Sequence, residues 1–512
     1  MNLTKNIVKD LIKSGAKAPD DLASFKRKMA KKYKISCLDN ISLLKSYHDL
    51  TNKGNIKKSP IIEGLLISRP IRSLSGIVNI SVLTKPYPCP GECIYCPSEK
   101  GIPKSYLSGE PAVERAKKLN YDPYLQVKKR IEMLKAEGHP TDKIELRVVG
   151  GTWSFYPKKY QEWFIKKCFD ACNKKNGKDL KKAQDLNEKE KHRIIGLSVE
   201  TRPDFIDNNE IERLRNLGAT MIELGVQSIY DNVLKLNKRN HNVDATIEAT
   251  KLLKDAGFKV LYQIMPNLLG SNPNKDREMF EELFKDPGFQ PDLLKIYPCA
   301  LLRKSPLYKL WREKKYKPYG EKKLINLLKS IKKIVPYYVR IQRITRDIPS
   351  QNVIAGGAKI SNSRQLLKNL SKKEGWKCKC IRCREVKGEY SLNEKICLFR
   401  KNYKASDGKE IFLSFENKDK TKLYSLLRLR ITSKNQAIIR EIHTYGQVVP
   451  LSKKIKAPQH RGLGKKLVEK AEKIARAEFG LKKISVISGI GVRNYFRKIG
   501  YKLENTYMVK NL

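Results

Sequence analysis

The chain has 512 residues, and a typical domain size of roughly 150 residues predicts three or four domains. Lys and Arg number 106 and Asp and Glu 53, so the formal charge is +53, while 40 % hydrophobic residues exclude a disordered basic tail. No apolar run of about 18 residues exists, which excludes a transmembrane helix. Residues 1–13 lack the apolar stretch of a secretory signal, so we expect a cytoplasmic protein with no membrane partner.

The charge of +53 favours a polyanionic partner such as RNA or DNA. The alternative is a lysine-rich surface that is merely solvated. Residues 1–75 add to the first interpretation, since they carry 16 Lys and Arg against 6 Asp and Glu. Pro19-Asp20-Asp21 is a helix start, after which Leu22, Phe25, Met29 and Tyr33 share one helix face. We therefore expect a small basic helical module that contacts nucleic acid.

Residues 76–345 alternate β-rich runs with helical stretches, which predicts βα units, a parallel sheet and a partial or full βα barrel. The expected strands are 77–84, 143–149, 193–199, 220–226, 259–265, 293–297 and 338–344. Polar and Gly-rich segments follow several of these strands: Gly150-Gly151-Thr152, Glu200-Thr201-Arg202 and Gln227-Ser228. Ligands of such barrels bind at the carboxyl ends of the strands, so these segments are candidate binding residues.

The first cysteine motif, Cys89-Pro-Gly-Glu-Cys93-Ile-Tyr-Cys96, has C-x3-C-x2-C spacing and follows the first barrel strand. Three thiolates can hold three irons of a 4Fe–4S cluster and leave the fourth iron open to a substrate. The alternative is a structural zinc site, although such sites usually have four ligands and a C-x2-C knuckle. The spacing and its place after a strand favour the cluster.

Residues 346–390 form an expected linker with a second motif, Cys378, Cys380 and Cys383. Thiolates this close repel one another unless a cation neutralises them, which predicts a structural zinc ion. The sequence leaves the fourth ligand open among Cys397, Cys299 and His443. The alternative is three independent thiols.

Residues 391–512 form an expected C-terminal α/β domain. Its central motif is Gln459-His460-Arg461-Gly462-Leu463-Gly464, which lies between the expected strand 437–443 and an amphipathic helix. A Gly-rich turn that opens a helix presents free backbone N–H groups to a pyrophosphate. We therefore expect an anion-binding loop here.

The first cysteine motif and its position resemble the radical S-adenosylmethionine (SAM) superfamily. This resemblance implies a partial βα barrel, a 4Fe–4S cluster on Cys89, Cys93 and Cys96, and SAM on the open iron, whose reductive cleavage gives a 5′-deoxyadenosyl radical. Gly150 and Gly151 match the superfamily's glycine motif, which meets the methionine amino group. Glu200 and Gln227, at later strand ends, are candidate contacts to SAM or substrate, or else plain polar lining of the barrel.

The Q-x-x-G-x-G sequence of residues 459–464 resembles the coenzyme A loop of GNAT acetyltransferases. The resemblance implies a GNAT acetyltransferase-like α/β domain that binds acetyl-CoA through Gln459, His460, Arg461, Gly462, Leu463 and Gly464. It also implies a catalytic tyrosine that faces the thioester sulfur, and Tyr495 is the nearest match. The alternative for Tyr495 is ordinary core packing.

Nearly the whole chain resembles the family of the Elongator catalytic subunit, and Phe496 is one departure, since a second Tyr is expected there. The family implies a tRNA-modifying enzyme. The radical would take hydrogen from the acetyl methyl group, the carbon radical would add to C5 of the anticodon wobble uridine, and thioester hydrolysis would leave a carboxymethyl group. A protein lysine acetyltransferase, or an RNA-binding scaffold with relic motifs, remains the alternative. Implied partners are the tRNA anticodon stem-loop, acetyl-CoA and an electron donor; a homodimer or accessory subunits stay open.

Overall fold

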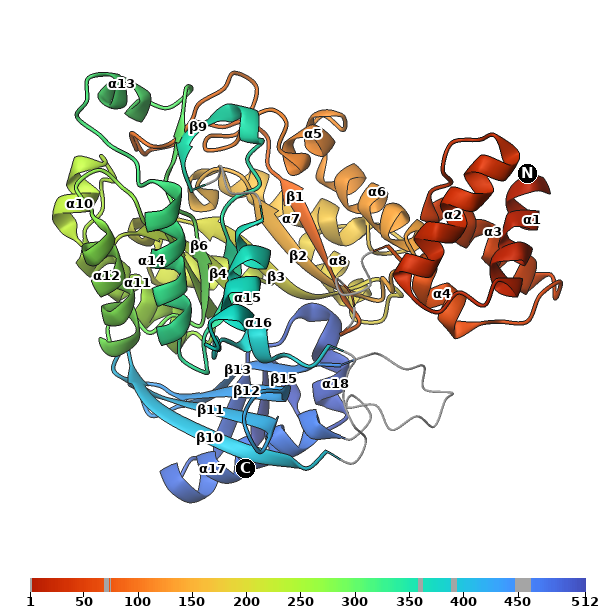
Figure 1. Cartoon of the computed structure of the whole chain (residues 1–512). Coiled ribbons are helices and arrows are strands. Elements are labelled where there is room, and N and C mark those ends of the chain that lie inside the picture. The colour runs from red at the N-terminus through yellow and green to blue at the C-terminus, as the bar shows by residue number, and fades with distance from the viewer. Residues whose placement is uncertain (1, 69–72, 74, 358–361, 388–393, 447–461) are drawn as a thin grey trace.

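The computed structural model describes residues 2–68, 73, 75–357, 362–387, 394–446 and 462–512. Figure 1 shows an N-terminal helical module to one side, a central barrel, and a C-terminal sheet beneath that barrel. Within these ranges, no helix is long and apolar enough to cross a lipid bilayer.

The N-terminal module consists of four helices: α1 (Asn2–Lys13), α2 (Pro19–Tyr33), α3 (Asn40–Asn52) and α4 (Pro60–Leu66). Helix α2 begins where the sequence predicts, because the Asp21 carboxylate accepts hydrogen bonds from the Lys17 and Ala18 N–H groups at 2.9 Å each. Leu22, Phe25 and Met29 are buried, as expected from their spacing. The module has a hydrophobic core of its own, separate from that of the barrel.

The barrel is a seven-stranded parallel sheet in the order β1-β2-β3-β4-β5-β6-β8. Its strands are β1 (Ile77–Leu83), β2 (Lys143–Val149), β3 (Arg193–Thr201), β4 (Met221–Gln227), β5 (Lys259–Ile264), β6 (Leu293–Ile296) and β8 (Arg340–Ile344). All seven residues of the central strand β4 are buried, as in a sheet covered on both faces. Since β1 and β8 are the two edges, the barrel is partial.

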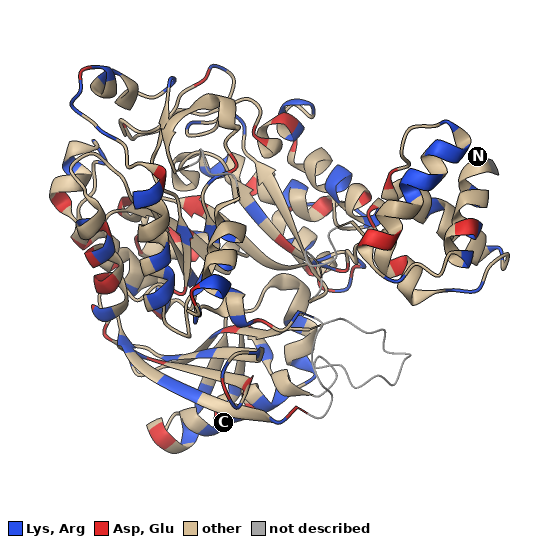
Figure 2. Cartoon of the chain, in the orientation of Figure 1, with Lys and Arg blue, Asp and Glu red and all other residues tan. Residues whose placement is uncertain are grey.

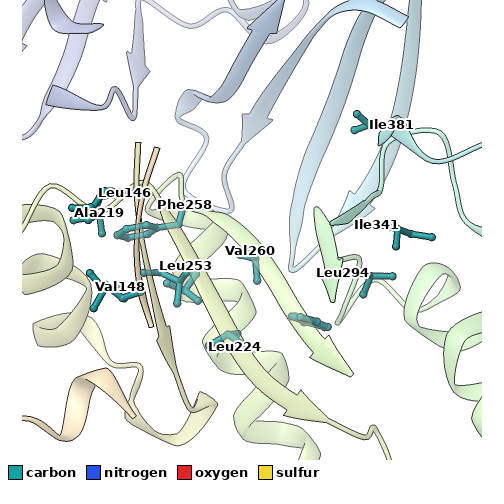
Figure 3. Packing of buried hydrophobic residues seen from close by; sticks show 14 of the residues in the cluster. Leu146, Val148, Ala219, Leu224, Leu253, Phe258, Val260, Leu294, Ile341 and Ile381 are labelled. Carbon is teal, nitrogen blue, oxygen red and sulfur yellow. The ribbon is translucent and has the colours of Figure 1, made fainter. Parts of the chain in front are cut away.

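Helices between the strands cover the outside of this sheet (Figure 1). They are α5 (Pro111–Lys117), α6 (Pro123–Ala136), α7 (Lys158–Asp170), α8 (Leu180–Asn187), α9 (Asn208–Asn216), α10 (Asp231–Leu236), α11 (Val243–Asp255), α12 (Pro273–Lys285) and α14 (Glu321–Ile334). The short α13 (Leu307–Arg312) lies apart from them, at the top of the view. Figure 3 shows strand residues such as Leu224 and Val260 packed with helix residues such as Leu253. This core fixes the strand ends that carry the site.

The segment after the barrel packs directly onto it. Strands β7 (Ala300–Leu302) and β9 (Val353–Gly356) form a small antiparallel sheet, followed by α15 (Ser363–Lys373) and α16 (Ile381–Arg384). The Ile381 N–H donates to Val339 O at 3.0 Å, and the Ile381 side chain lies near Ile341 of β8 (Figure 3). The second cysteine motif is thereby anchored to the edge of the barrel.

The C-terminal domain is a seven-stranded sheet in the order β10-β11-β12-β13-β14-β16-β15. The strands are β10 (Ile396–Ala405), β11 (Gly408–Asn417), β12 (Leu423–Ile431), β13 (Ala437–Thr444), β14 (Lys483–Val486), β15 (Lys502–Glu504) and β16 (Tyr507–Asn511); the helices are α17 (Leu463–Phe479) and α18 (Arg493–Arg497). The parallel strands β13 and β14 pair only over three residues, up to Ile439 and Val486. Beyond that point the sheet opens.

Buried ion pairs join this domain to the barrel. Arg440 on β13 binds both carboxylate oxygens of Asp292, which precedes β6, and also donates to Phe258 O at 2.6 Å. Arg428 on β12 donates to Tyr338 O at 2.7 Å. Because unpaired charges are costly to bury, these contacts hold the two domains in one relative position.

Candidate active site

The first cysteine motif lies in the loop after β1, at the carboxyl end of the barrel strands. Cys93 is buried, while Cys89 and Cys96 are partly exposed. Two backbone hydrogen bonds fix the loop: the Ile94 N–H donates to Asn237 O at 3.2 Å, and Ile94 O accepts from the Leu307 N–H at 2.8 Å. The three thiols therefore have defined positions.

Gly91 allows this loop to fold tightly around the thiols. A Cβ at this position would lie 2.6 Å from Arg202 Nη1, 3.5 Å from Cys93 Sγ and 3.8 Å from Cys89 Sγ. A side chain here would collide with the Arg202 guanidinium, while the two sulfurs would lie at ordinary contact distance. The glycine in the motif is thus a requirement of close packing.

The spacing of the sulfurs separates a cluster from a single metal ion. Among the described residues, only Cys378, Cys380 and Cys383 form a group of three metal-ligating side chains whose ligand atoms all lie within 4.8 Å of one another. A zinc ion with Zn–S bonds of about 2.3 Å needs its sulfurs within about 4 Å. The sulfurs of Cys89, Cys93 and Cys96 are not all this close, which fits thiolates that bind different irons of a 4Fe–4S cluster.

Two buried arginines surround this loop. Arg239 Nη1 donates to Cys93 Sγ at 3.5 Å, and Arg202 is held by two hydrogen bonds to Asp204 at 2.7 and 2.8 Å. Burial, reinforced by neighbouring Cys93, raises the pKa of the Cys96 thiol to about 12. A thiol with such a raised pKa ionises only when a cationic centre binds it, and Arg239 adds positive charge beside the neighbouring Cys93. The donor set therefore fits an iron–sulfur cluster.

Gly150 and Gly151 lie beside the cluster loop. Gly150 has φ +151°, and a Cβ there would collide with Thr84 Oγ1, so only glycine fits. Thr152 Oγ1 lies 3.8 Å from Cys89 Sγ. The residue that follows the glycine pair therefore lies close to the first cysteine of the motif.

A cavity of about 830 Å³ adjoins Cys96, and we call it the cluster cavity. Glu200 and Gln227 both line it, as expected for strand ends that face a ligand. Glu200 accepts hydrogen bonds from Lys295 Nζ at 2.9 Å, from Gln263 Nε2 at 3.0 Å and from the Tyr106 hydroxyl at 3.3 Å. Glu200 is therefore a fixed, hydrogen-bonded carboxylate at the wall of the cavity.

Lys295 lies between Glu200 and Glu223 and pairs with both. Burial opposes ionisation of Glu200, but attraction to Lys295 outweighs it and holds the pKa of Glu200 below its usual value. Burial raises the pKa of Glu223, which lies deeper. Glu200 is thus the charged carboxylate that a cationic ligand would meet.

The second cysteine motif forms a compact group, because the three sulfurs lie within 4.8 Å of one another. Cys380 is buried and Cys383 is exposed, and Lys332 Nζ on α14 donates to Cys383 Sγ at 3.5 Å. The candidate fourth ligands Cys397, Cys299 and His443 do not belong to this group. Within the described residues, the donor set fits a metal ion with three protein ligands.

The expected coenzyme A loop lies at the start of α17. Gln459, His460 and Arg461 fall outside the described residues. Gly462 has φ +67°, Leu463 is the first helical residue and is buried, and Gly464 follows it. A Cβ at Gly464 would lie 3.5 Å from Thr444 Oγ1 on β13 and 3.8 Å from the Tyr495 hydroxyl. The helix start, the open end of β13 and Tyr495 therefore meet at one point.

Tyr495 is 40 % exposed, whereas the adjacent Phe496 is 2 % exposed. Tyr495 is therefore not part of the hydrophobic core, and Phe496 is. The Tyr495 side chain is thus partly open to solvent beside the start of α17.

Two further cavities lie between the barrel and the C-terminal domain. The interdomain cavity, about 570 Å³, shares Arg130, Arg147, Gln342 and Arg343 with the cluster cavity. The split cavity, about 150 Å³, lies at the β13–β14 opening and shares Ile77, Glu145, Lys259, Glu441 and His443 with the interdomain cavity. Adjacent hollows therefore run from the cysteine loop to the opening of the C-terminal sheet.

Arg239 and Lys295 are not among the site residues predicted from the sequence. Lys295 lies in the strand Leu293–Ile296, and a lysine in an otherwise apolar strand indicates that a buried acidic side chain lies nearby. Arg239 follows α10 in a polar loop, and nothing in its local sequence marks it.

A parallel half-barrel with a three-cysteine loop at its carboxyl end, here joined to a C-terminal α/β domain, defines a radical SAM protein. Residues 87–283 match the Radical SAM superfamily, and residues 291–373 match the Radical_SAM C-terminal domain.

The chain belongs to the family of Elongator complex protein 3 and the tRNA uridine(34) acetyltransferases. It is 46 % identical to the tRNA uridine(34) acetyltransferase of Methanocaldococcus jannaschii, over 89 % of this chain and 88 % of that protein. It is 38 % identical to Elongator complex protein 3 of Homo sapiens, over 99 % of this chain and 96 % of that protein. The structure of the archaeal Methanocaldococcus infernus Elp3 with an N-terminal deletion matches with a TM-score of 0.75 and 42 % identity, over 86 % of this chain and all of that one.

Proposed function

We propose that this chain uses SAM-derived radical chemistry and acetyl-CoA to install a carboxymethyl group at C5 of the anticodon wobble uridine of tRNA. The observation that carries the proposal is the row of adjacent cavities between the cysteine loop and the β13–β14 opening. Two relatives are named tRNA uridine(34) acetyltransferases, which supports tRNA as the substrate.

For the radical half, we assign Cys89, Cys93 and Cys96 to a 4Fe–4S cluster, and Gly150, Gly151, Glu200 and Gln227 to SAM. When bound, the cluster supplies the electron that cleaves SAM to a radical able to take hydrogen from a methyl group. The protein's part is to orient the ligands and exclude water. The ionised Glu200 carboxylate suits the cationic amino group or sulfonium of SAM.

For the acetyl half, we assign Gly462, Leu463 and Gly464 to the pyrophosphate of acetyl-CoA, with Gln459, His460 and Arg461 beside them. Free N–H groups at the start of α17 attract an anion. The β13–β14 opening leaves room for the pantetheine arm, and the exposed Tyr495 hydroxyl would face the thioester. The acetyl group would then point toward the split cavity.

For the tRNA, the charge of +53 supplies attraction to phosphates. Figure 2 shows Lys and Arg over the N-terminal module, the barrel and the C-terminal domain, so the whole chain shares the charge. We propose that a tRNA-binding module comprises residues 1–75 and that the radical SAM barrel comprises residues 76–345. The zinc-binding linker would be residues 346–390, and the acetyl-CoA domain residues 391–512. Cys378, Cys380 and Cys383 would bind the zinc ion. The free cysteines suit a reducing, cytoplasmic compartment with an electron donor.

Nucleoside mass spectrometry tests the proposal. Anaerobically reconstituted protein is incubated with unmodified tRNA, SAM, acetyl-CoA and a reductant. We expect carboxymethyluridine that is lost when SAM or acetyl-CoA is omitted. Acetyl transfer to lysine peptides without SAM, and no modified uridine, would instead support a protein lysine acetyltransferase.

A further inference from the structure

His443 lies on the part of β13 that has no partner in β14. The strand pairing ends at Ile439 and Val486, whereas β13 continues to Thr444. Ile442 and Thr444 point toward Gly464 at the start of α17. Because side chains alternate along a strand, His443 faces the other way, toward the barrel.

Two contacts confirm this orientation. Glu441, on the same strand face as His443, pairs with Lys259 at the start of β5. Tyr445, on that face as well, accepts a hydrogen bond from Arg340 of β8 at 3.3 Å and stacks on the His443 ring with a centroid distance of 4.2 Å. The imidazole therefore sits between the C-terminal domain and the barrel.

His443 lines both the interdomain cavity and the split cavity. A group at this place lies on the route between the proposed thioester and the barrel.

The carboxylates that line the interdomain cavity all form ion pairs with Lys or Arg side chains. Glu145 pairs with Arg147, Glu385 with Arg340, and Glu441 with Lys259 and Arg428. Although burial opposes it, attraction to Lys259 and Arg428 lowers the pKa of Glu441 to about 2, so this carboxylate stays ionised and held in its ion pairs.

The His443 imidazole is different. Its Nε2 has no hydrogen-bond partner among the described residues. Burial lowers the pKa of His443 to about 4, with Glu441 and Glu385 raising it and Arg340 and Lys259 lowering it. The ring is thus neutral at pH 7 and can accept a proton.

The proposed function needs a base at this place. Once the acetyl carbon is joined to the uridine, the product is still a CoA thioester, and water must cleave it. We propose that His443 is the general base for this hydrolysis, an inference that rests on the proposed function. The imidazole takes a proton from water, the hydroxide oxygen forms a bond to the thioester carbon, and the C–S bond breaks. The electron pair leaves with the CoA sulfur, and the proton held by His443 passes to that thiolate, so a carboxylic acid and a thiol are released. The acid then loses its remaining proton to solvent and becomes the carboxylate.

The test compares His443→Gln and His443→Ala with the wild-type protein. Gln keeps hydrogen-bonding capacity but is not a base. A positioned base typically contributes 10²–10⁴-fold. Acetyl-CoA carries the same thioester bond as the uridine adduct, so its hydrolysis reports on the base without the radical step. We therefore expect both variants to release thiol from acetyl-CoA, in the presence of tRNA and without SAM, at least 100-fold more slowly, with KM unchanged. Added imidazole should restore His443→Ala at least tenfold. The matched control His192→Gln changes a histidine that lines none of the three cavities and should behave as wild type.

In the complete reaction, His443→Gln should still cleave SAM and should accumulate uridine carrying a CoA thioester instead of carboxymethyluridine. Equal rates of thiol release in wild type and His443→Gln would overturn the inference, as would the lack of release by the wild type. A loss of carboxymethyluridine without adduct, while thiol release depends on His443, would count against the proposed function and leave the role of His443 intact. Circular dichroism and melting temperature report whether the variants fold.

Discussion

Arg440 on β13 and Asp292 before β6 form two hydrogen bonds, at 2.6 and 2.8 Å, and neither side chain is exposed to solvent. One belongs to the C-terminal domain and the other to the barrel. The Asp292 carboxylate also accepts from the Val260 N–H at 2.9 Å, which ties the pair to the backbone of β5. The relative position of the two proposed cofactor sites therefore depends on a buried ion pair.

Breaking this pair should destabilise the whole protein. Arg440→Leu or Asp292→Asn removes one member of a buried ion-pair network that also contains Glu410 and Arg428, and we expect a loss of about 3–5 kcal/mol in the free energy of unfolding. Arg440→Met with Asp292→Leu should recover little of it, because Glu410 and Arg428 then each lose a buried partner. Urea unfolding measures both. The exposed pair Arg277–Glu281 is the control, since Arg277→Ala should cost about 0.5 kcal/mol or less. Equal effects at the two sites would contradict the assigned role.

Lys254 should give the stability a pH dependence on the alkaline side. The side chain is buried and donates to Gln290 O at 2.6 Å, and burial lowers its pKa to about 8, although Asp292 and Glu410 oppose the shift. Between about pH 8 and 10.5 the unfolded chain keeps a proton that the folded protein has lost, so stability rises with pH there. Lys254→Met should remove this rise, and exposed Lys251→Met should keep it. Denaturant midpoints across that range decide the matter.

Each of Cys89, Cys93 and Cys96 should be needed for iron binding. A Ser variant at any of them removes one thiolate, so we expect anaerobically reconstituted protein to lose most of its iron and acid-labile sulfide and its visible absorption. The exposed Cys37→Ser is the control and should keep both. Iron content equal to wild type in all three variants would show that the cluster is held elsewhere.

Cys378, Cys380 and Cys383 should carry zinc. We expect about one zinc per chain by elemental analysis, lost in Cys380→Ser, with iron content unaffected because the two cysteine groups are separate. Cys397→Ser should retain zinc, because Cys397 is not part of the three-sulfur group. Zinc retained in Cys380→Ser would contradict this assignment.

Gly464→Val should separate ligand binding from stability. A Cβ at this position meets its neighbours at 3.5 Å or more, so the fold accepts a side chain. The branched side chain would, however, occupy the point where α17, β13 and Tyr495 meet. We expect the Kd for acetyl-CoA to rise at least tenfold by calorimetry, with little change in Tm. Unchanged affinity would place the coenzyme elsewhere.

The elements that sequence predicted best are those with strong local patterns. The expected strand over residues 143–149 agrees with β2 at both ends, because a run of alternating apolar residues bounded by polar turns strongly favours a strand. Helix α2 begins at Pro19 because the proline and two aspartates before an apolar face define a helix start. The first cysteine motif lies after the carboxyl end of β1, as its position directly after the first predicted strand indicates.

Features that depend on distant partners were missed. Strands β7 and β9 are three and four residues long and pair only across some 50 residues of chain, so their local sequence carries no signal. His443 was a candidate zinc ligand, but the structure places it between two domains. Its orientation depends on where β13 stops pairing with β14, which no local pattern records.

The two edges of the half-barrel have a consequence for the cluster cavity. In a closed barrel the circumference is fixed, because every strand hydrogen-bonds to two neighbours. Strands β1 and β8 are not bonded to each other. Ser81 of β1 and Arg343 of β8 line the cluster cavity, so the seam opens onto it. No hydrogen bond between β1 and β8 therefore sets the width of this seam, in contrast to a closed barrel, in which every strand is bonded on both sides.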